Sequence, residues 1–168
     1  DVGCGRDEKV MEGRVSAEEV LGWKAWPGRE LSPAVGLVRV VKYDKRERTD
    51  AALRAFTASE IAYLVGVAER CGFAQMRVVF DLRGFSLWQH GDVEAARTVV
   101  RLLSGVYPER LQRVYLVDAP VLFQTLWAVV KGWLDENARG KVVFCGREEM
   151  KGAVEGELWD AMFSGGDK

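Results

Sequence analysis

The sequence lacks several features that would assign it to a large class of proteins. No apolar run approaches the roughly eighteen residues that a membrane-spanning helix requires. The 24 Lys and Arg residues nearly balance the 25 Asp and Glu residues, for a formal net charge of −1. Without an overall positive field, nucleic acid is not an expected partner. Residues 1–8 are polar and contain neither an initiating Met nor the apolar core of a signal peptide, so we expect a fragment or a processed piece.

Residues that bind metals or form disulfides are also scarce. The three cysteines, Cys4, Cys71 and Cys145, show no Cys-x-x-Cys spacing, which favours reduced thiols in a cytosolic setting. The single histidine, His90, could bind zinc with Cys71 and Cys145, but no two of these residues have ligand spacing. We therefore expect no metal site.

Enzyme motifs are incomplete in the same way. Asp81, Ser86 and His90 are the residue types of a hydrolytic triad, but Ser86 is not in a Gly-x-Ser-x-Gly elbow. Asp81 is more simply a turn cap after a strand. Gly140 and Lys141 do not form a P-loop, because Val142 occupies the position of the magnesium-binding Ser or Thr. We expect no catalytic residue, no enzyme activity and no cofactor, and a small α/β hydrolase remains only an alternative.

The composition indicates a compact domain. A chain of 168 residues buries roughly 70% of its unfolded surface, and 48% hydrophobic residues can form one sizeable core. Apolar patterns predict strands over residues 34–43 and 76–82 and helices over 57–72 and 92–106. A capping-box pattern at Ser16 predicts a short helix that ends near Trp26.

Residues 107–146 carry the most informative pattern. Pro108 ends a helix, and the β-branched residues 114–117 predict a buried strand. Asp118 and Pro120 are suited to the start of a helix over 121–134, which is apolar on most of its surface. A second buried strand follows at 141–145, so this segment predicts a βαβ unit. Glu148 and Glu149 are typical of the first turn of one more helix.

A set of motifs in this order resembles the CRAL-TRIO lipid-binding domain over residues 76–150. The motifs are Asp-Leu-Arg-Gly-Phe-Ser at 81–86, Tyr-Pro-Glu-Arg-Leu at 107–111, Val-Asp-Ala-Pro at 117–120, Lys-Gly-Trp-Leu-Asp at 131–135 and Gly-Lys-Val-Val-Phe at 140–144. The family includes phosphatidylinositol transfer proteins. The resemblance implies an α/β fold with a mixed, largely parallel sheet flanked by helices, and a lipid cavity closed by a gate helix.

The resemblance also implies residue roles. Glu109 and Lys141 match the pair that binds the lipid headgroup in members specific for phosphatidylinositol. The implied pocket and gate residues are Leu122, Phe123, Leu126, Trp127, Val130, Trp133 and Leu134 on the helix, with Met76 and Val78 on a strand. We expect residues 1–33 to be a remnant of a helical region and residues 34–168 to form the lipid-binding domain.

Three positions depart from the family. Ala138 replaces a Thr that assists the inositol headgroup, and Met76 and Val78 replace the Ser and Thr that mark phosphatidylcholine binding. Phosphatidylcholine is therefore disfavoured as the ligand, while phosphatidylinositol and a less polar lipid remain candidate ligands. The expected function is binding and transfer of one lipid by a cytoplasmic monomer that contacts membranes transiently. A degenerate interaction module that exchanges no lipid is the main alternative.

Overall fold

The computed structural model describes residues 24–26, 34–43, 45–46, 50–70, 72, 74–151 and 163. The strands are β1 (Lys24–Trp26), β2 (Ala34–Arg39), β3 (Met76–Asp81), β4 (Leu111–Val117) and β5 (Val142–Cys145). The α-helices are α2 (Asp50–Arg70), α3 (Leu87–His90), α4 (Val93–Arg101), α5 (Phe123–Val130), α6 (Glu136–Gly140) and α7 (Arg147–Met150). Shorter turns are η2 (Val40–Lys42), the π-helical η3 (Leu102–Val106) and η4 (Lys131–Trp133).

The described strands form one sheet in the order β1-β2-β3-β4-β5. Strands β2 to β5 are parallel, and β1 joins β2 antiparallel at the edge. One row of the sheet aligns Gly36, Val78, Val114 and Val142 across its four parallel strands. This arrangement confirms the predicted mixed, largely parallel sheet flanked by helices.

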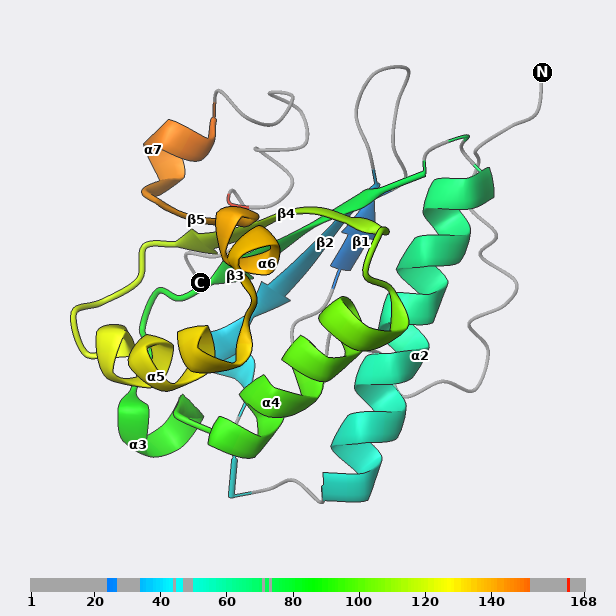
Figure 1. The fold of residues 1–168 in the computed structure, drawn as a ribbon. Coiled ribbons are helices and arrows are strands. Elements are labelled where there is room, and N and C mark those ends of the chain that lie inside the picture. Colours follow the sequence, from blue (N-terminus) through cyan, green and yellow to red (C-terminus); the bar gives the residue numbers. More distant parts are fainter. Residues whose placement is uncertain are drawn as a thin grey trace.

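The alternation of side chains along the parallel strands creates two cores. Val78 and Leu116 face a core shared with α2, α4 and α5, whereas Val79 and Val117 face a second core that contains Met150. Figure 1 shows α2, α4 and α5 on one side of the sheet and α7 on the other. A ligand could therefore be enclosed between the sheet and the three helices α2, α4 and α5.

Side-chain caps explain where several helices begin. Asp92 accepts a hydrogen bond from the Ala95 backbone N–H at 2.9 Å and starts α4, and Asp135 accepts from the Ala138 N–H at 2.7 Å and starts α6. A short helix therefore occupies residues 136–140, between the apolar helix and β5. The predicted helix 92–106 is α4 continued by a π-helical turn.

The start of the apolar helix also differs from the prediction. Asp118 is not its N-cap: the residue has φ of 51°, and α5 begins at Phe123 after a turn in which the Phe123 N–H bonds to Pro120 O at 2.9 Å. The Asp118 side chain instead contacts Arg147, 29 residues along the chain. The predicted helix 121–134 is therefore α5 followed by the 3-10 turn η4.

The N-terminal region differs in one place that the structure describes. Lys24–Trp26 is a strand paired with Val35–Leu37 and is not the end of a helix. The rest of the predicted helix from Ser16, and most of the proposed segment 1–33, lie outside the described residues. Within the described part of the chain, no further strand lies between β2 and α2.

Candidate functional site

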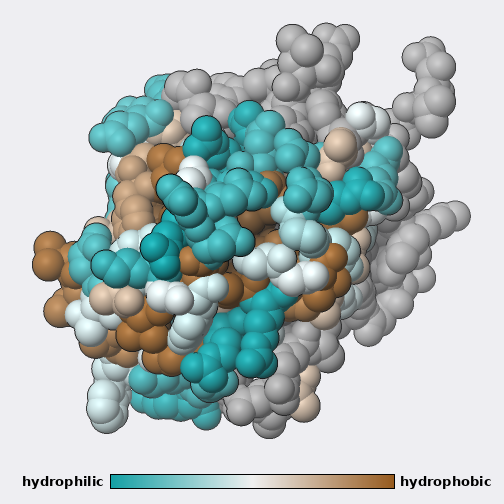
Figure 2. All heavy atoms as spheres, in the orientation of Figure 1, coloured by the Kyte–Doolittle hydropathy of each residue, from teal (hydrophilic) through white to brown (hydrophobic). Residues whose placement is uncertain are grey.

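A cavity of about 220 Å³ lies between the sheet and the helices that cover its α2, α4 and α5 face. Its floor is formed by sheet residues Val78, Phe80, Val114, Leu116 and Val142. Its roof includes Ala96, Val99 and Leu103 from the α4 side and Phe123, Leu126 and Trp127 from α5. One water needs roughly 10–15 Å³ of such space, so this cavity is much more than a packing defect. Figure 2 shows apolar atoms gathered over the α5 side of the same face.

The structure places most of the predicted pocket residues on this cavity. Those that line it are Phe123, Leu126, Trp127, Val130 and Leu134, with Val78 on the floor. Met76 is fully buried in the adjoining core but is not a lining residue. Leu122 is 59% exposed, and Trp133 packs under Arg97, with the guanidinium carbon 4.9 Å from the ring centroid. These last two residues lie outside the cavity wall.

A series of aromatic contacts connects α5 to the neighbouring elements. The Phe123 ring lies 5.3 Å from Phe85 and 6.2 Å from Phe144 between centroids, and Trp127 lies 5.3 Å from Phe144. The Phe123–Phe85 and Trp127–Phe144 pairs are edge-to-face, and such pairs add roughly 0.5–1.5 kcal/mol each beyond area burial. These contacts, rather than backbone hydrogen bonds, hold much of α5 against the domain.

The predicted headgroup pair lies at the amino-terminal edge of the parallel strands. Lys141 directly precedes β5, and its Nζ donates a hydrogen bond to the carbonyl of Pro108 at 3.3 Å. Glu109 directly follows Pro108 in the chain and is exposed. Its backbone carbonyl accepts a hydrogen bond from Gln75 Nε2 at 3.3 Å. Neither side chain lines the described cavity wall. Ala138, whose carbonyl accepts from the Lys141 N–H at 3.2 Å, does line it.

The opposite end of the cavity holds buried polar side chains that the sequence did not indicate as a group. The Tyr43 hydroxyl donates to Asp92 Oδ2 at 2.5 Å, and both residues line the cavity together with His90. Each of the three is at most 8% exposed. Tyr43 and Asp92 were missed because they are 49 residues apart and each has an ordinary local interpretation. Only the topology brings them together.

The residues considered for a hydrolytic triad make other contacts. His90 Nδ1 accepts a hydrogen bond from the Ser86 backbone N–H at 2.8 Å, where a triad would place a carboxylate. Ser86 Oγ accepts from the Gln89 N–H at 3.5 Å as the cap of α3. The Asp81 carboxylate forms a bidentate ion pair with Arg83, with a shortest distance of 2.7 Å.

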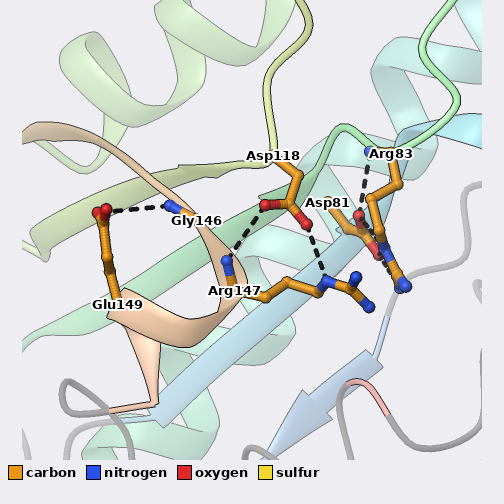
Figure 3. Close-up of polar contacts among 6 residues, drawn as sticks. All are labelled: Asp81, Arg83, Asp118, Gly146, Arg147 and Glu149. Atoms are coloured by element: carbon orange, nitrogen blue, oxygen red, sulfur yellow. Dashed lines mark hydrogen bonds and ion pairs between the residues drawn. The ribbon is translucent and has the colours of Figure 1, made fainter.

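Two Asp–Arg pairs secure the carboxyl ends of the central strands (Figure 3). Asp81 accepts from Arg83, and Asp118 Oδ2 lies 2.8 Å from Arg147 Nε while Oδ1 accepts from the Arg147 N–H at 3.2 Å. None of these residues lines the cavity. Asp118–Arg147 joins the loops after β4 and β5, and Asp81–Arg83 closes the turn after β3, so the role of both pairs is structural.

Burial and the nearby carboxylates Glu149 and Asp118 raise the pKa of the Cys145 thiol above its ordinary value of 9.0. Cys145 is a free cysteine, while Cys4 and Cys71 lie outside the described residues. In the described part of the chain, no cluster of three His, Cys, Asp or Glu side chains could hold a metal ion. The described helices include none that is long and apolar enough to cross a membrane.

Comparison with known sequences decides the family. A sequence model of the CRAL/TRIO domain matches residues 33–165, which include the parallel strands β2 to β5 and all the residues that line the cavity. The chain belongs to the CRAL/TRIO family.

Relatives of this CRAL/TRIO chain match shorter segments. "Protein real-time" of Anopheles gambiae is 37% identical over 82 residues, which are 47% of this chain and 12% of that protein. "Phosphatidylinositol transfer protein CSR1" of Eremothecium gossypii is 31% identical over 67 residues, 40% of this chain and 15% of that protein. "Phosphatidylinositol transfer protein SFH5" of Saccharomyces cerevisiae is 33% identical over 70 residues, 40% of this chain and 24% of that protein. The matches thus span under a quarter of these relatives' lengths.

A solved structure supports the same fold. The crystal structure of Sfh5 matches 80% of this chain and 50% of its own chain, with a TM-score of 0.55 and 22% identity. At this identity the match shows the CRAL/TRIO fold and no more.

Proposed function

We propose that this domain binds a single lipid in the cavity beneath α5 and transfers it between membranes. The observation that carries the proposal is the cavity itself, which is lined by apolar side chains over most of its wall. Burial of apolar surface contributes roughly 25 cal/mol per Å², so an apolar chain inside this space is strongly favoured over water. Binding and release break no covalent bond, and the proposed domain is not an enzyme and uses no cofactor.

The gate in this proposal is α5 with η4. The helix contributes Phe123, Leu126 and Trp127 to the wall, and its outer side carries Val129, which is 44% exposed. Because α5 is held largely by side-chain contacts with Phe85 and Phe144, it can swing outward without breaking the sheet. Outward movement would open the cavity along its length.

The headgroup end is proposed at Glu109 and Lys141. Ser104 and Ala138 line the cavity near this edge, and Ser104 is exposed, so the cavity approaches solvent there. An ammonium and a carboxylate at this opening suit a headgroup that carries a phosphate and hydroxyl groups. The names of the CSR1 and SFH5 relatives favour a phosphatidylinositol-type lipid, whereas Ala138 in place of Thr leaves a less polar lipid as the other candidate.

Membrane contact is proposed beside the gate. Val121 is 86% exposed, Leu122 59% and Trp88 78%, and Figure 1 shows α3 next to the start of α5. Lys45 Nζ lies 5.8 Å from the centroid of the Trp88 ring. An indole beside an ammonium is well suited to the interface of an anionic membrane. We expect the protein to reach membranes transiently, as a monomer.

A transfer assay between vesicles tests the proposal. Donor vesicles contain a fluorescent phosphatidylinositol and a quencher, and acceptor vesicles contain neither, so transfer raises the fluorescence. Leu126→Asp places a carboxylate in the cavity wall and should abolish uptake, whereas Val129→Asp on the outer side of the same helix should retain it. Uptake that is equal in both variants would reject the cavity as the binding site.

A second variant separates loss of the cavity from loss of folding. Ala96→Phe fills the cavity from α4 without adding a charge, and Ala62→Phe makes the same change on an exposed position of α2. Only Ala96→Phe should prevent uptake. The competing hypothesis of an interaction module without lipid exchange predicts no uptake by the unaltered protein.

A further inference from the structure

The carboxyl end of the proposed gate is held differently from its amino end. At the amino end, Phe123 packs on the Phe85 ring in the core shared with α2 and α4. At the carboxyl end, Trp133 is not among the described side chains that pack on either core or line the cavity. Its ring lies instead against Arg97 of α4, with 4.9 Å between the guanidinium carbon and the ring centroid. Arg97 therefore connects the end of the gate to a helix outside the gate.

The backbone around Trp133 is a place where the gate can pivot. Val130, three residues earlier, and Leu134, directly after Trp133, both line the cavity, so movement here displaces the cavity wall. The chain changes from the 3-10 turn η4 to an extended conformation at Leu134, where φ is −94° and ψ is 135°. The Leu134 N–H bonds to the Lys131 carbonyl at 3.4 Å, a long distance for such a bond. Side-chain contacts therefore contribute much of what holds this end in place.

Two arginines supply such contacts from different helices. Arg139 of α6 donates from Nε to the Lys131 carbonyl at 2.9 Å. Because α6 begins only three residues after the end of η4, this bond can move together with the gate. Arg97 belongs to α4, which packs against α2 and is not part of the gate. The Arg97–Trp133 contact is therefore one that opening of the gate has to break.

The surroundings of Arg97 favour this contact. Glu94, one turn earlier on α4, lies 3.4 Å from Arg97 Nη1 and orients the guanidinium. Tryptophan offers the most favourable ring for a cation–π contact, and a guanidinium is planar and remains charged. Arg101, on the next turn of α4, is exposed and has no ion pair or ring contact among the described residues. Only the first of these two arginines is in position to hold the gate.

We propose that Arg97 is a positioning residue that holds the gate closed through Trp133 and sets how fast the cavity exchanges its contents. The inference rests on the proposed lipid-binding function and adds a residue that controls its rate. Neither side chain lines the cavity, so the contact stabilises the closed gate equally with and without a lipid inside. Loss of the contact should therefore speed lipid uptake and lipid release by the same factor and leave the affinity unchanged. A residue that supported only the lipid-bound form would change the affinity instead.

Stopped-flow fluorescence with a phosphatidylinositol that carries a fluorescent acyl chain measures both rates. Uptake is followed after mixing protein with labelled vesicles that contain a quencher, and release after mixing loaded protein with excess unlabelled vesicles. In Arg97→Gln both rate constants should rise roughly two- to fivefold, the factor expected for an exposed cation–π contact, with the dissociation constant within about twofold. Trp133→Leu removes the ring but keeps an apolar side chain, and should give the same acceleration. Unchanged rates, or faster release with weaker affinity, would overturn the inference.

Arg101→Gln is the matched control, because it removes the same charge one turn along α4. Its rates should equal those of the unaltered protein, and an acceleration equal to that of Arg97→Gln would reject the contact in favour of a general charge effect. Arg97→Gln combined with Trp133→Leu should be no faster than either change alone, since both remove one contact, and additive acceleration would contradict the inference. If the unaltered protein takes up no labelled lipid, the proposed function itself fails. If it takes up lipid at rates that do not depend on Arg97, only the role of Arg97 fails.

Discussion

The Lys141 ammonium donates a hydrogen bond to the carbonyl oxygen of Pro108 at 3.3 Å, although the two residues are 33 positions apart. This contact joins the chain segments that precede β4 and β5, and it places the ammonium next to the Tyr-Pro-Glu turn that contains Glu109. The contacts of the described residues lead to two predictions about lipid and membrane binding and two about the fold.

The first prediction concerns the headgroup end. Lys141→Ala should lower the affinity for phosphatidylinositol at least about tenfold, because a hydrogen bond to a charged group contributes roughly 1.5–3 kcal/mol. The same change at the exposed Lys131 should alter affinity less than twofold. Titration of both variants with vesicles of fixed phosphatidylinositol content measures the difference. Equal affinities would remove Lys141 from the headgroup site.

The second prediction concerns membrane contact. Trp88→Ala should weaken binding to vesicles that contain anionic lipid about tenfold, since an indole that leaves water contributes roughly 1.5–3 kcal/mol. Val121→Ser should act in the same direction, whereas Val106→Ser, at another exposed valine, should not. Sedimentation with vesicles checks this. Unchanged sedimentation of Trp88→Ala would place the membrane contact elsewhere.

The third prediction concerns the loop after β4. Asp118 has φ of 51° and accepts two hydrogen bonds from Arg147, so Asp118→Ala should lower the free energy of unfolding by roughly 1–3 kcal/mol. Asp118→Asn should lower it less, because Asn tolerates this backbone conformation and keeps an acceptor oxygen. Urea unfolding of the two variants gives the comparison. A larger loss in the Asn variant would contradict the explanation.

The fourth prediction concerns pH. The pKa of Cys145 in the folded protein is raised by burial first and then by Glu149 and Asp118. The unfolded thiol ionises near 9.0 while the folded one stays protonated, so this group's contribution to stability is present below pH 9 and is lost as the pH rises through the folded pKa. Alkylation of Cys145, followed by peptide mass spectrometry, should be slower at pH 8 than alkylation of free cysteine. Faster alkylation would be incompatible with a raised pKa.

Sequence reasoning predicted the parts of the fold that depend on local pattern. The residues around Val78 form a buried parallel strand, and Leu126 and Val130 on the apolar helix line the cavity. Both were predictable because the spacing of apolar residues in the sequence matches the period of the element that forms. The pattern failed at Asp118, where a residue type suited to an N-cap adopts a positive φ and binds Arg147 instead. Propensity is a weak guide where a tertiary contact offers a stronger partner.

The polar end of the cavity, formed by Tyr43, His90 and Asp92, could not have been predicted in this way. Asp92 has the ordinary signature of a helix cap, which it is, and Tyr43 is the last residue of the strand predicted over 34–43. Their hydrogen bond depends on the parallel register of β2 and β3, and no spacing in the sequence encodes it. Likewise, Met76 and Trp133 have the apolar character of pocket residues, but the register and helix length place them outside the wall.

The most direct test of the central claim is the lipid content of the purified protein. Organic extraction of freshly purified protein, followed by mass spectrometry, should recover close to one lipid molecule per chain, and recovery from Leu126→Asp should fall to background while Val129→Asp retains it. Protein that yields no lipid and takes none from vesicles would contradict a lipid-binding function.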